Sequence, residues 1–543
     1  MDYLSRLEGC LPVEARRNLR DSRYISNVLN LIREHRWLFV GTTMAALVLR
    51  LFFFFHVPAV TDDSHIYAKL ATNWLQHGVY GQTQGGQPEK QIVPTDTRLP
   101  GYPAFLAAVF WLFGAGNFKA VMLTQILVDL ATCLIVADLA RQTISERAAR
   151  VAFVLAALCP FLANYAAAVL TETLEVFFTA LALDCAAAAL NRMHAARDEA
   201  RAEPGALDQS YRKLWAATGA ALAACILLRP DGGILLGALT LYLAVLAWRH
   251  RVDKKNVADI LVAGIIVVVI ALAALAPWTI RNFRTLHHLQ PLAPRYANET
   301  DELLPRGFNR WVKTWIADYA SVEEIYWNVP GDKIDPEKLP SRAMDNPAER
   351  GETLAVISDY NQSQDMTPEL DARFRNMAAH RIRAHPVRYY FVLPLLRVAD
   401  MWLRPRTEIL PPDVRWWEFN DDTKQSVIAV GFGLLNLAYV AAALLALIRG
   451  QSRAQSRGQA RRPSGIRWAG LLISFLLLRS TFLGTLENPE PRYTLECYPA
   501  IIVLASSLLC RSKFAGGAPG LRARLDPSTS LRAGSRGARR STI

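Results

Sequence analysis

Two adjacent aspartates, Asp62 and Asp63, are residues whose type and position favour chemistry. They lie in 61-TDDSHIYAKLATNWLQHGVYG-81, directly after the apolar run 37–57, where membrane and water would meet. Like charges this close, near a low dielectric, raise one another's pKa, and a proton-accepting group benefits from such tuning. The same residues also suit an acidic helix N-cap, because 61-TDDS-64 leads into an apolar helical pattern. Both interpretations stay open and are compatible, since a helix start also holds a carboxylate in place.

The composition indicates that membrane-spanning helices position these aspartates. Of 543 residues, 52% are apolar and 20% charged, and the apolar residues gather into runs such as 37–57 and 258–278. Runs of about 20 apolar residues are long enough to cross a bilayer. This excludes an ordinary soluble protein, a disordered chain and a disulfide scaffold. Because cytoplasmic loops of membrane proteins collect Lys and Arg, we interpret the net charge of +13 as a topology signal and predict no nucleic-acid partner.

The chain is predicted to be an all-α polytopic membrane protein with about ten transmembrane helices. Their expected ranges are 37–57, 118–140, 149–169, 172–192, 214–229, 232–249, 258–278, 425–448, 466–484 and 495–510. With both termini in the cytoplasm, every inner loop carries Lys or Arg, as the positive-inside rule requires. The first span is expected to be an uncleaved signal anchor. This orientation places the aspartates on the outer face, and we expect the membrane to be the cytoplasmic (inner) membrane.

Two shorter apolar stretches, 101–114 and 386–403, are predicted to be interfacial helices on the outer face. The first is shorter than a usual span, and the second carries Arg388, Arg397 and Asp400. Counting either as a span would turn the later basic loops outward. Amphipathic helices of this kind lie in the membrane surface with the apolar side down.

The predicted organisation has five parts. They are a cytoplasmic segment (1–36), a membrane core (37–278) whose first outer loop is 58–117, an extracytoplasmic segment (279–424), C-terminal transmembrane helices (425–510) and a disordered basic cytoplasmic tail (511–543). Within the outer segment, Thr367-Pro368 followed by an acidic first turn predicts the start of a helix.

Several ordered motifs resemble the dolichyl-phosphate-mannose–protein mannosyltransferase-like family, which is glycosyltransferase family 39 with its bacterial relatives. An Asp-x-x-x-Tyr pattern follows the first span and an Arg-x-Pro-Gly-Tyr-Pro element precedes a short apolar helix. The matching residues are Asp63, Tyr67, Arg98, Pro100, Gly101, Tyr102 and Pro103. Membrane-edge motifs of the family resemble 170-LTETLEVF-177, 228-LRPDG-232, 277-PWTIRN-282 and 487-ENPEPRYTLECYP-499. The resemblance runs through most of residues 37–510 and implies the GT-C membrane fold.

The resemblance also implies a reaction. Such enzymes move a sugar, here a mannose-like hexose or similar, from a polyprenyl phosphate to an acceptor protein, lipid or glycan outside the cytoplasmic membrane, usually with inversion. A carboxylate must remove the acceptor proton, and cations must offset charge on the departing phosphate. The implied catalytic residues are Asp63 and Asp62; the implied donor-phosphate or substrate-binding residues are Tyr67, Arg98, Tyr102, Glu172, Arg281, Arg492 and Tyr493. The commoner family motif is Asp-Glu, whereas Ser64 follows Asp63, so either aspartate is a candidate base.

Some of these residues have simpler explanations. Arg229 and Arg281 end predicted spans, where arginines often extend to lipid headgroups. Glu172 begins a span, where a helix N-terminus favours a carboxylate in any case. Arg492 lies in a compact charged turn, which favours a site role. Arg50 lies inside the first span and needs a buried partner or a lipid phosphate, unless it extends to the surface.

Two other function classes compete with the glycosyltransferase hypothesis. A polyprenol-linked sugar flippase or other transporter would place ionisable residues near the bilayer midplane, often in paired halves. A structural protein would use segment 279–424 to bind partners. Most charges in this sequence lie at span ends, which favours the enzyme. No Cys, His, Asp or Glu spacing supports a metal site. No cofactor is therefore predicted; a divalent metal stays open but has no support in the sequence.

Overall fold

The computed structural model describes residues 30–83, 91–202, 210–298, 303–419, 422–456 and 465–510, and most of them are helical. The first half contains α3 (Arg36–His56), α4 (Asp62–His77), β1 (Gly81–Thr83), β2 (Ile92–Pro94), α5 (Gly101–Phe113), α6 (Phe118–Thr143), α7 (Glu146–Ala157), α8 (Pro160–Ala166), α9 (Glu172–Ala202), α10 (Ser210–Leu228), η1 (Pro230–Gly232), α11 (Gly233–Arg249), α12 (Lys254–Ala273) and α13 (Ala276–Leu286).

The second half contains residues 279–424, named the outer segment after its predicted position, and the last helices of the bundle. Its elements are α14 (Arg306–Val312), α15 (Tyr319–Ser321), η2 (Val322–Tyr326), η3 (Pro336–Lys338), η4 (Ser341–Ala343), α16 (Pro347–Ser363), α17 (Pro368–Ala384), η5 (Arg388–Val392), α18 (Leu393–Leu403), α19 (Thr423–Ser456), α20 (Gly465–Gly484), η6 (Pro491–Cys497) and α21 (Tyr498–Leu509).

Six helical segments of the described residues are long and apolar enough to cross a membrane, or seven if the bent pair α7 and α8 is one span. The chain is therefore a multi-pass membrane protein, but the predicted count of about ten spans is not confirmed. Helices α10, α20 and α21 are not among the six. α21 has only 12 residues, and α10 carries Arg212 and Lys213 near its start. A short helix, or one with charged residues, has fewer consecutive apolar residues with which to span a bilayer.

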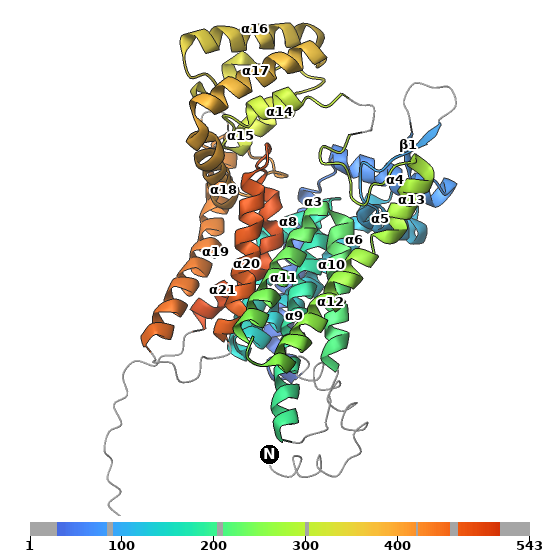
Figure 1. Ribbon diagram of the computed structural model, residues 1–543, viewed down its shortest axis with the longest axis vertical. Coiled ribbons are helices and arrows are strands. Elements are labelled where there is room, and N and C mark those ends of the chain that lie inside the picture. Colours follow the sequence, from blue (N-terminus) through green and yellow to red (C-terminus); the bar gives the residue numbers. More distant parts are fainter. Residues whose placement is uncertain are drawn as a thin grey trace, which may run out of the picture. The chain divides into compact units, whose positions relative to one another are not determined.

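These three helices nevertheless pack with the long ones. α10 packs against α9 and α12, α20 packs against α11, and α21 packs against α19 (Figure 1). α9 also packs against α6. The buried face of α9 is rich in alanine, including Ala182, Ala186 and Ala189. Small side chains allow membrane helices to approach closely, which explains how α9 becomes the centre of the bundle.

A buried ion pair joins the first span to its neighbours. Arg50 is fully buried in α3, and its Nε donates to Asp129 Oδ2 on α6 at 2.7 Å. Its Nη1 also donates to the carbonyl of Ala157 at the end of α7, at 2.5 Å. The partner expected for Arg50 is thus Asp129. A charge inside a bundle persists where it is paired and hydrogen-bonded, as here.

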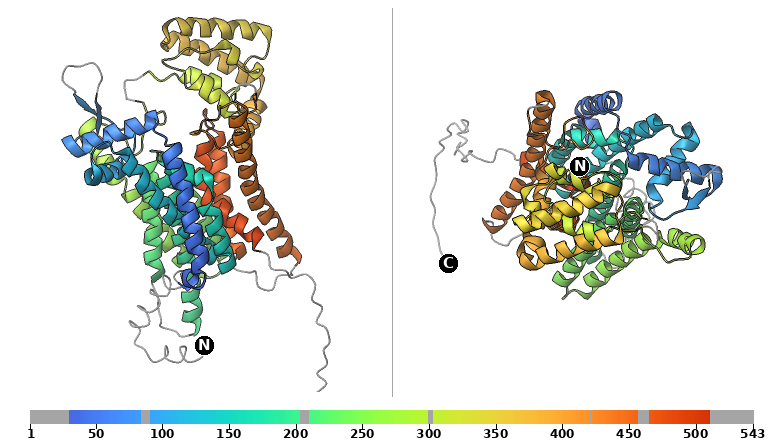
Figure 2. Two further views of the ribbon diagram at one scale, coloured as in Figure 1. Left: turned by 180° about the vertical axis from the view of Figure 1, so that it is seen from behind. Right: turned by 90° about the horizontal axis from the view of Figure 1, so that it is seen from above.

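The outer segment forms its own small core. Trp311, Trp315 and Phe374 pack together between α14 and α17. α17 begins where the Thr-Pro signal predicts, because Thr367 accepts a hydrogen bond from the Leu370 N–H. Figures 1 and 2 show α14, α16 and α17 at the end of the helix bundle where α4 and α5 also lie.

The residues predicted to form the first outer loop contain a short helix, two paired strands and an apolar helix. β1 and β2 pair antiparallel between α4 and α5. Ser64 fixes the start of α4: its Oγ accepts from the Thr61 N–H at 2.9 Å and donates to the Val169 carbonyl at 2.8 Å. The expected acidic helix start is present, and Ser64 ties it to the segment before α9. The interfacial placement of the helices in 101–114 and 386–403 stays a prediction.

Candidate active site

One cavity of about 660 Å³ collects most of the residues that the sequence singles out. Its walls come from the start of α4, the loop before α5, the start of α9, η1 with the end of α10, the loop after α13, and η6. The charged residues that line it are Asp63, Arg98, Glu172, Arg229, Asp231, Arg295 and Arg492. We call it the main cavity. Its lining therefore places four arginines against three carboxylates, which favours an anionic ligand.

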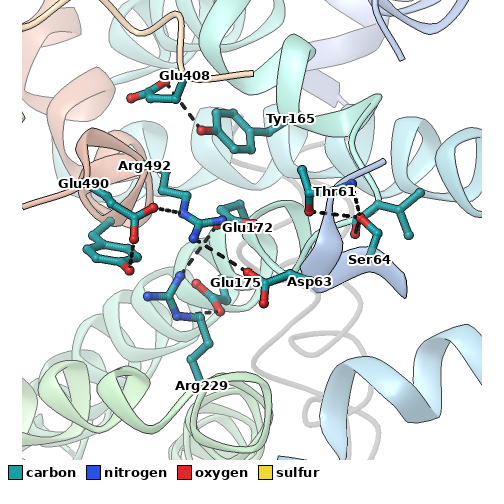
Figure 3. Close-up of polar contacts among 12 residues, drawn as sticks. Thr61, Asp63, Ser64, Tyr165, Glu172, Glu175, Arg229, Glu408, Glu490 and Arg492 are labelled. Atoms are coloured by element: carbon teal, nitrogen blue, oxygen red, sulfur yellow. Dashed lines mark hydrogen bonds and ion pairs between the residues drawn. The ribbon is translucent and has the colours of Figure 1, made fainter. Parts of the chain in front are cut away.

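Asp63 contacts two of these arginines, and Figure 3 shows its contact with Arg492. Arg98 Nη2 donates to Asp63 Oδ1 at 3.0 Å, and Arg492 Nη2 lies 3.7 Å from Oδ2. The Asp63 side chain keeps 32% of its surface exposed, so it remains open to the cavity. Asp63 is the second residue of α4, and the Ser64 contacts hold that helix end in place. The carboxylate is thus both fixed and accessible.

These arginines control the proton affinity of Asp63. Burial by itself would raise its pKa, but Arg492 and then Arg98 outweigh this effect and hold the pKa of Asp63 below its usual 3.8. An opposite charge at this distance favours the ionised carboxylate. The sequence-based expectation was the reverse, a pKa raised by the neighbouring Asp62. The difference arises because Asp62 is exposed and does not line the cavity, whereas two arginines contact Asp63.

Glu172 and Arg492 line the main cavity next to Asp63. Arg492 Nη1 and Arg229 Nη1 lie 3.7 and 3.6 Å from Glu172 Oε1. Glu172 is almost fully buried, and its second oxygen, Oε2, has no hydrogen-bond partner within the described chain. Arg492 Nε also lies 2.5 Å from Glu490 Oε2. Arg492 therefore faces three carboxylates from three different elements.

Arg229 is held more completely than Arg98. Its Nε lies 3.4 Å from Glu175 and 3.2 Å from Asp231, and its guanidinium stacks over the Tyr493 ring at 4.7 Å. Arg98 by contrast donates to Asp63 and, at 3.3 Å, to its neighbouring carbonyl of Thr97. Since an arginine has five N–H donors, Arg98 keeps more of them available for a ligand.

Arg479, which no sequence motif indicated, holds together two of the segments that form the main cavity. It is fully buried in α20, and its Nη2 bonds Glu496 at 2.7 Å and Asp231 at 2.8 Å. It also donates to the Tyr493 carbonyl at 3.0 and 3.2 Å. An arginine inside a predicted span was the signal available, the same one that drew attention to Arg50.

The tyrosines differ in their relation to the cavity. Tyr67 lines it, and Arg98 lies over its ring at 5.9 Å. Tyr493 also lines it and hydrogen-bonds through its hydroxyl to Glu490. Tyr102 lies behind Tyr67, with its ring edge-on at 5.1 Å and its hydroxyl donating to Gln125 at 2.7 Å. Tyr102 therefore supports the wall and does not line the cavity.

Arg281 does not join the cavity. Its guanidinium donates to the carbonyls of Thr95 at 2.8 Å and Tyr80 at 2.5 Å, and it stacks on the rings of Tyr80 and Trp278. These contacts fasten α13 to the hairpin. In the part of the chain that the structure describes, no group of three or more His, Cys, Asp or Glu side chains is arranged to hold a metal ion.

The fold and the cavity together define a multi-pass membrane protein with an arginine-lined, carboxylate-containing site beside the helix ends. Residues 95–197 match the family model described as dolichyl-phosphate-mannose-protein mannosyltransferase. This segment includes Arg98, Tyr102 and Glu172, and the resemblance predicted from the motifs is confirmed over it. The helices and this match agree with the predicted all-α GT-C class. No curated protein matches the chain significantly by sequence.

Two solved structures are similar to the chain over most of its length. The archaeal oligosaccharyltransferase AglB from Archaeoglobus fulgidus, solved with an inhibitory peptide and a dolichol-phosphate, is 13% identical, with a TM-score of 0.45 over 87% of this chain. The chain spans 50% of the length of that protein. ArnT from Cupriavidus metallidurans in the apo state is 16% identical, with a TM-score of 0.34 over 88% of this chain and 77% of its own.

Proposed function

We propose that the protein is a glycosyltransferase that moves a mannose-like hexose from a polyprenyl phosphate to an acceptor on the outer face of the cytoplasmic membrane. The observation that carries the proposal is Asp63, held open to the main cavity between Arg98 and Arg492. The family match over residues 95–197 supports the same reaction class. A base beside two phosphate-binding cations is the arrangement such a transfer needs.

Arg98 and Arg492 are the residues that would hold the donor phosphate. Arginine matches phosphate geometry with paired N–H donors, and its charge offsets the negative charge that grows on the leaving group. Among the described residues, Arg98 forms one ion pair, with Asp63, and is therefore less engaged by carboxylates than Arg492 or Arg229. Arg229, fixed by Glu175 and Asp231, shapes the wall and contributes charge from behind. Glu172 Oε1 lies between Arg492 and Arg229 and holds both guanidinium groups in place.

Donor binding would activate Asp63. In the free protein Arg492 and Arg98 depress its pKa, which makes the carboxylate ionised but a weak base. A bound phosphate would take up part of the charge of both arginines, and the pKa of Asp63 would rise toward the range where proton acceptance is efficient. The base is therefore strengthened only when a donor is present, which limits reaction of the empty site.

The transfer itself would be a single displacement. Asp63 accepts the proton of the acceptor hydroxyl, and the acceptor oxygen bonds to the anomeric carbon. The bond from that carbon to the phosphate oxygen breaks, and its electron pair leaves with the lipid phosphate. One displacement at the anomeric carbon inverts its configuration. The apolar helices α5 and η5–α18 would receive the prenyl chain at the membrane surface.

The test compares cell-envelope glycans and glycoproteins from cells with the gene, without it, and with the Asp63→Asn variant. Mass spectrometry is expected to find a hexose modification that disappears without the gene and is not restored by Asp63→Asn. If the protein were a flippase, the hexose modification would be lost only in variants that no longer transport the lipid-linked sugar. Full restoration by Asp63→Asn, with transport in vesicles and no transfer, would overturn the proposal in favour of a transporter.

A further inference from the structure

A histidine–aspartate pair holds the segment that carries Arg98 and lies outside the lining of the main cavity. His288 belongs to the loop after α13, and Asp96 belongs to residues 95–98, which we call the Arg98 segment. His288 Nε2 lies 2.8 Å from Asp96 Oδ2. The Asp96 side chain is 4% exposed and the His288 side chain 36%. The pair therefore combines a buried carboxylate with a ring that protons can reach from the solvent.

The turn at the end of α13 places His288. His287 ends this helix in the left-handed conformation, with a φ of 58°. A positive φ is uncommon outside glycine and persists where the surrounding structure holds it. Asn282, which is buried in α13, donates to the Gln290 carbonyl at 2.8 Å and fixes the chain beyond the turn. His288 is thus held in a set position against Asp96.

Both ring nitrogens of His288 face oxygen atoms that accept hydrogen bonds. Nδ1 lies 3.1 Å from the Leu286 carbonyl oxygen, and Nε2 lies against Asp96. A carbonyl and an ionised carboxylate have no hydrogen to donate. A neutral imidazole has one N–H, so it could donate to only one of these oxygens and would turn a lone pair toward the other. The doubly protonated ring donates to both, and the geometry therefore matches the imidazolium.

Two further contacts hold the Arg98 segment. Arg281 Nη1 donates to the Thr95 carbonyl at 2.8 Å, and the Tyr80 hydroxyl donates to the Arg98 carbonyl at 2.9 Å. The Asp96 side chain is anchored between these two points. Together the contacts fix the backbone from which the Arg98 side chain reaches the main cavity. A change at His288 therefore reaches Arg98 through two peptide units.

The surroundings of the pair decide what deprotonation of His288 does. The neighbouring charged or titratable groups are Tyr80, Arg98, Arg281 and His287, whereas α4 packs apolar side chains against this region. The charge of Arg281 acts on Asp96, but its N–H groups donate to backbone carbonyls. Loss of the proton from His288 would thus remove the cation in direct contact with Asp96.

We propose that His288 is a positioning residue for Arg98 and acts in its doubly protonated form. The imidazolium binds Asp96, which fixes the Arg98 segment so that Arg98 can meet the donor phosphate. When the pH rises, the ring releases one proton to water, one of its two hydrogen bonds is lost and Arg98 is held less firmly. Histidine changes charge between pH 5 and 8. The positioning claim stands on the pair, whereas its consequence for the donor rests on the proposed function.

The test compares the affinities of purified full-length proteins for undecaprenyl phosphate at about pH 5 and about pH 8, the ends of this range. The phosphate also titrates there, but this effect cancels in the ratio between two proteins. Wild type should bind several-fold more tightly than His288→Gln at the lower pH and equally at the higher pH. His288→Arg keeps a permanent cation and should bind more tightly than His288→Gln at both. Asp96→Asn should behave as His288→Gln does.

His380→Gln removes an exposed histidine of α17 and is the matched control, which should follow the wild type at both pH values. Equal affinity of wild type and His288→Gln at the lower pH overturns the positioning role. A ratio that is the same at both pH values overturns its dependence on the proton. If His288→Gln does not fold, the ratio of His288→Arg to wild type takes its place: it should rise several-fold toward the higher pH, and a constant ratio overturns the proposal.

NMR of labelled histidine separates failure of this inference from failure of the proposed function. The ring-carbon signal of His288, identified as the one missing in His288→Gln, should report two ring protons at the lower pH and one at the higher pH. A titrating ring in a protein that does not bind undecaprenyl phosphate would reject the proposed function and keep the state of the pair. A ring that stays neutral throughout, with undecaprenyl phosphate still bound, would reject this inference and keep the proposed function.

Discussion

At the residue scale, the candidate site depends on the contacts that two arginines make with one carboxylate. Arg98 and Arg492 contact opposite oxygens of Asp63, and together they keep it ionised. The neighbouring Asp62, which the sequence treats as an equal candidate, has no such contacts and is exposed. The structure thus gives a physical reason to prefer Asp63 as the proposed base. It also makes the reactivity of that base dependent on what the arginines bind.

The pH dependence of transfer follows from the lowered pKa of Asp63. Only the ionised carboxylate accepts a proton. Because the pKa of Asp63 in the free protein lies below 3.8, protonation of Asp63 should lower kcat/KM only at pH values below 3.8. Arg98→Gln removes a lowering influence, and the acid limb of kcat/KM should move to higher pH. The limb of kcat, which reports the donor-bound state, should already lie higher in the wild type. An acid limb that is unmoved in Arg98→Gln would contradict this account.

Arg492 should contribute strongly to phosphate binding. A hydrogen bond to a charged group contributes about 1.5–3 kcal/mol, so Arg492→Gln should weaken the binding of undecaprenyl phosphate by roughly tenfold to a hundredfold. Arg492→Lys should recover only part of this, since lysine lacks the paired donors. Arg310→Gln, an exposed arginine on α14, serves as control. Isothermal titration in detergent measures the affinities, and unchanged binding in Arg492→Gln would exclude the phosphate role.

At the element scale, helix ends bring the site together. η1, η6 and the first turns of α4 and α9 each contribute a charged side chain, and Arg479 on α20 joins η1 to η6. The sequence could identify Arg98, Glu172 and Arg492 because each lies in a motif at a span end. It could not identify Arg479, whose partners Asp231 and Glu496 become neighbours only after folding. Arg281 lies outside the lining of the main cavity, and its carbonyl partners on Thr95 and Tyr80 could not be read from the sequence either.

Removal of Arg479 should destabilise this junction. Arg479→Gln leaves the buried Glu496 without its cation, while Asp231 keeps Arg229. Breaking a buried ion pair costs about 3–5 kcal/mol. The unfolding temperature in detergent, followed by tryptophan fluorescence, should fall clearly. Arg284→Gln, an exposed arginine of α13, should leave it unchanged. Equal unfolding temperatures for both variants would show that Arg479 does not hold η1 and η6 together.

At the scale of the whole molecule, the membrane topology decides which side the chemistry faces. The apolar runs were enough to predict a multi-pass helical protein, because a bilayer demands long apolar helices. The number of spans was less predictable from the sequence. α21 is short and α10 carries charges near its start, yet both helices pack inside the bundle. The outer segment, with α14 and α17 around Trp311 and Trp315, has a soluble-type core that hydropathy alone does not describe.

Labelling of single cysteines tests the proposed orientation. α11 begins at the main cavity with Gly233 and runs 17 residues, about 25 Å, to the turn that contains Val252. Val252 is 93% exposed. A Val252→Cys variant should react with a membrane-impermeant maleimide only after permeabilisation, and Ser363→Cys on α16 should react in intact cells. The reverse pattern would place the main cavity on the cytoplasmic side.

Sugar transfer by purified protein from a synthetic undecaprenyl-phosphate hexose tests the central claim most directly. A general base contributes about 10²–10⁴-fold, so Asp63→Asn should lower kcat by at least a hundredfold, with donor binding retained. Asp62→Asn, which changes a carboxylate outside the cavity lining, should remain within a few-fold of wild type. Undiminished turnover by Asp63→Asn would contradict the account.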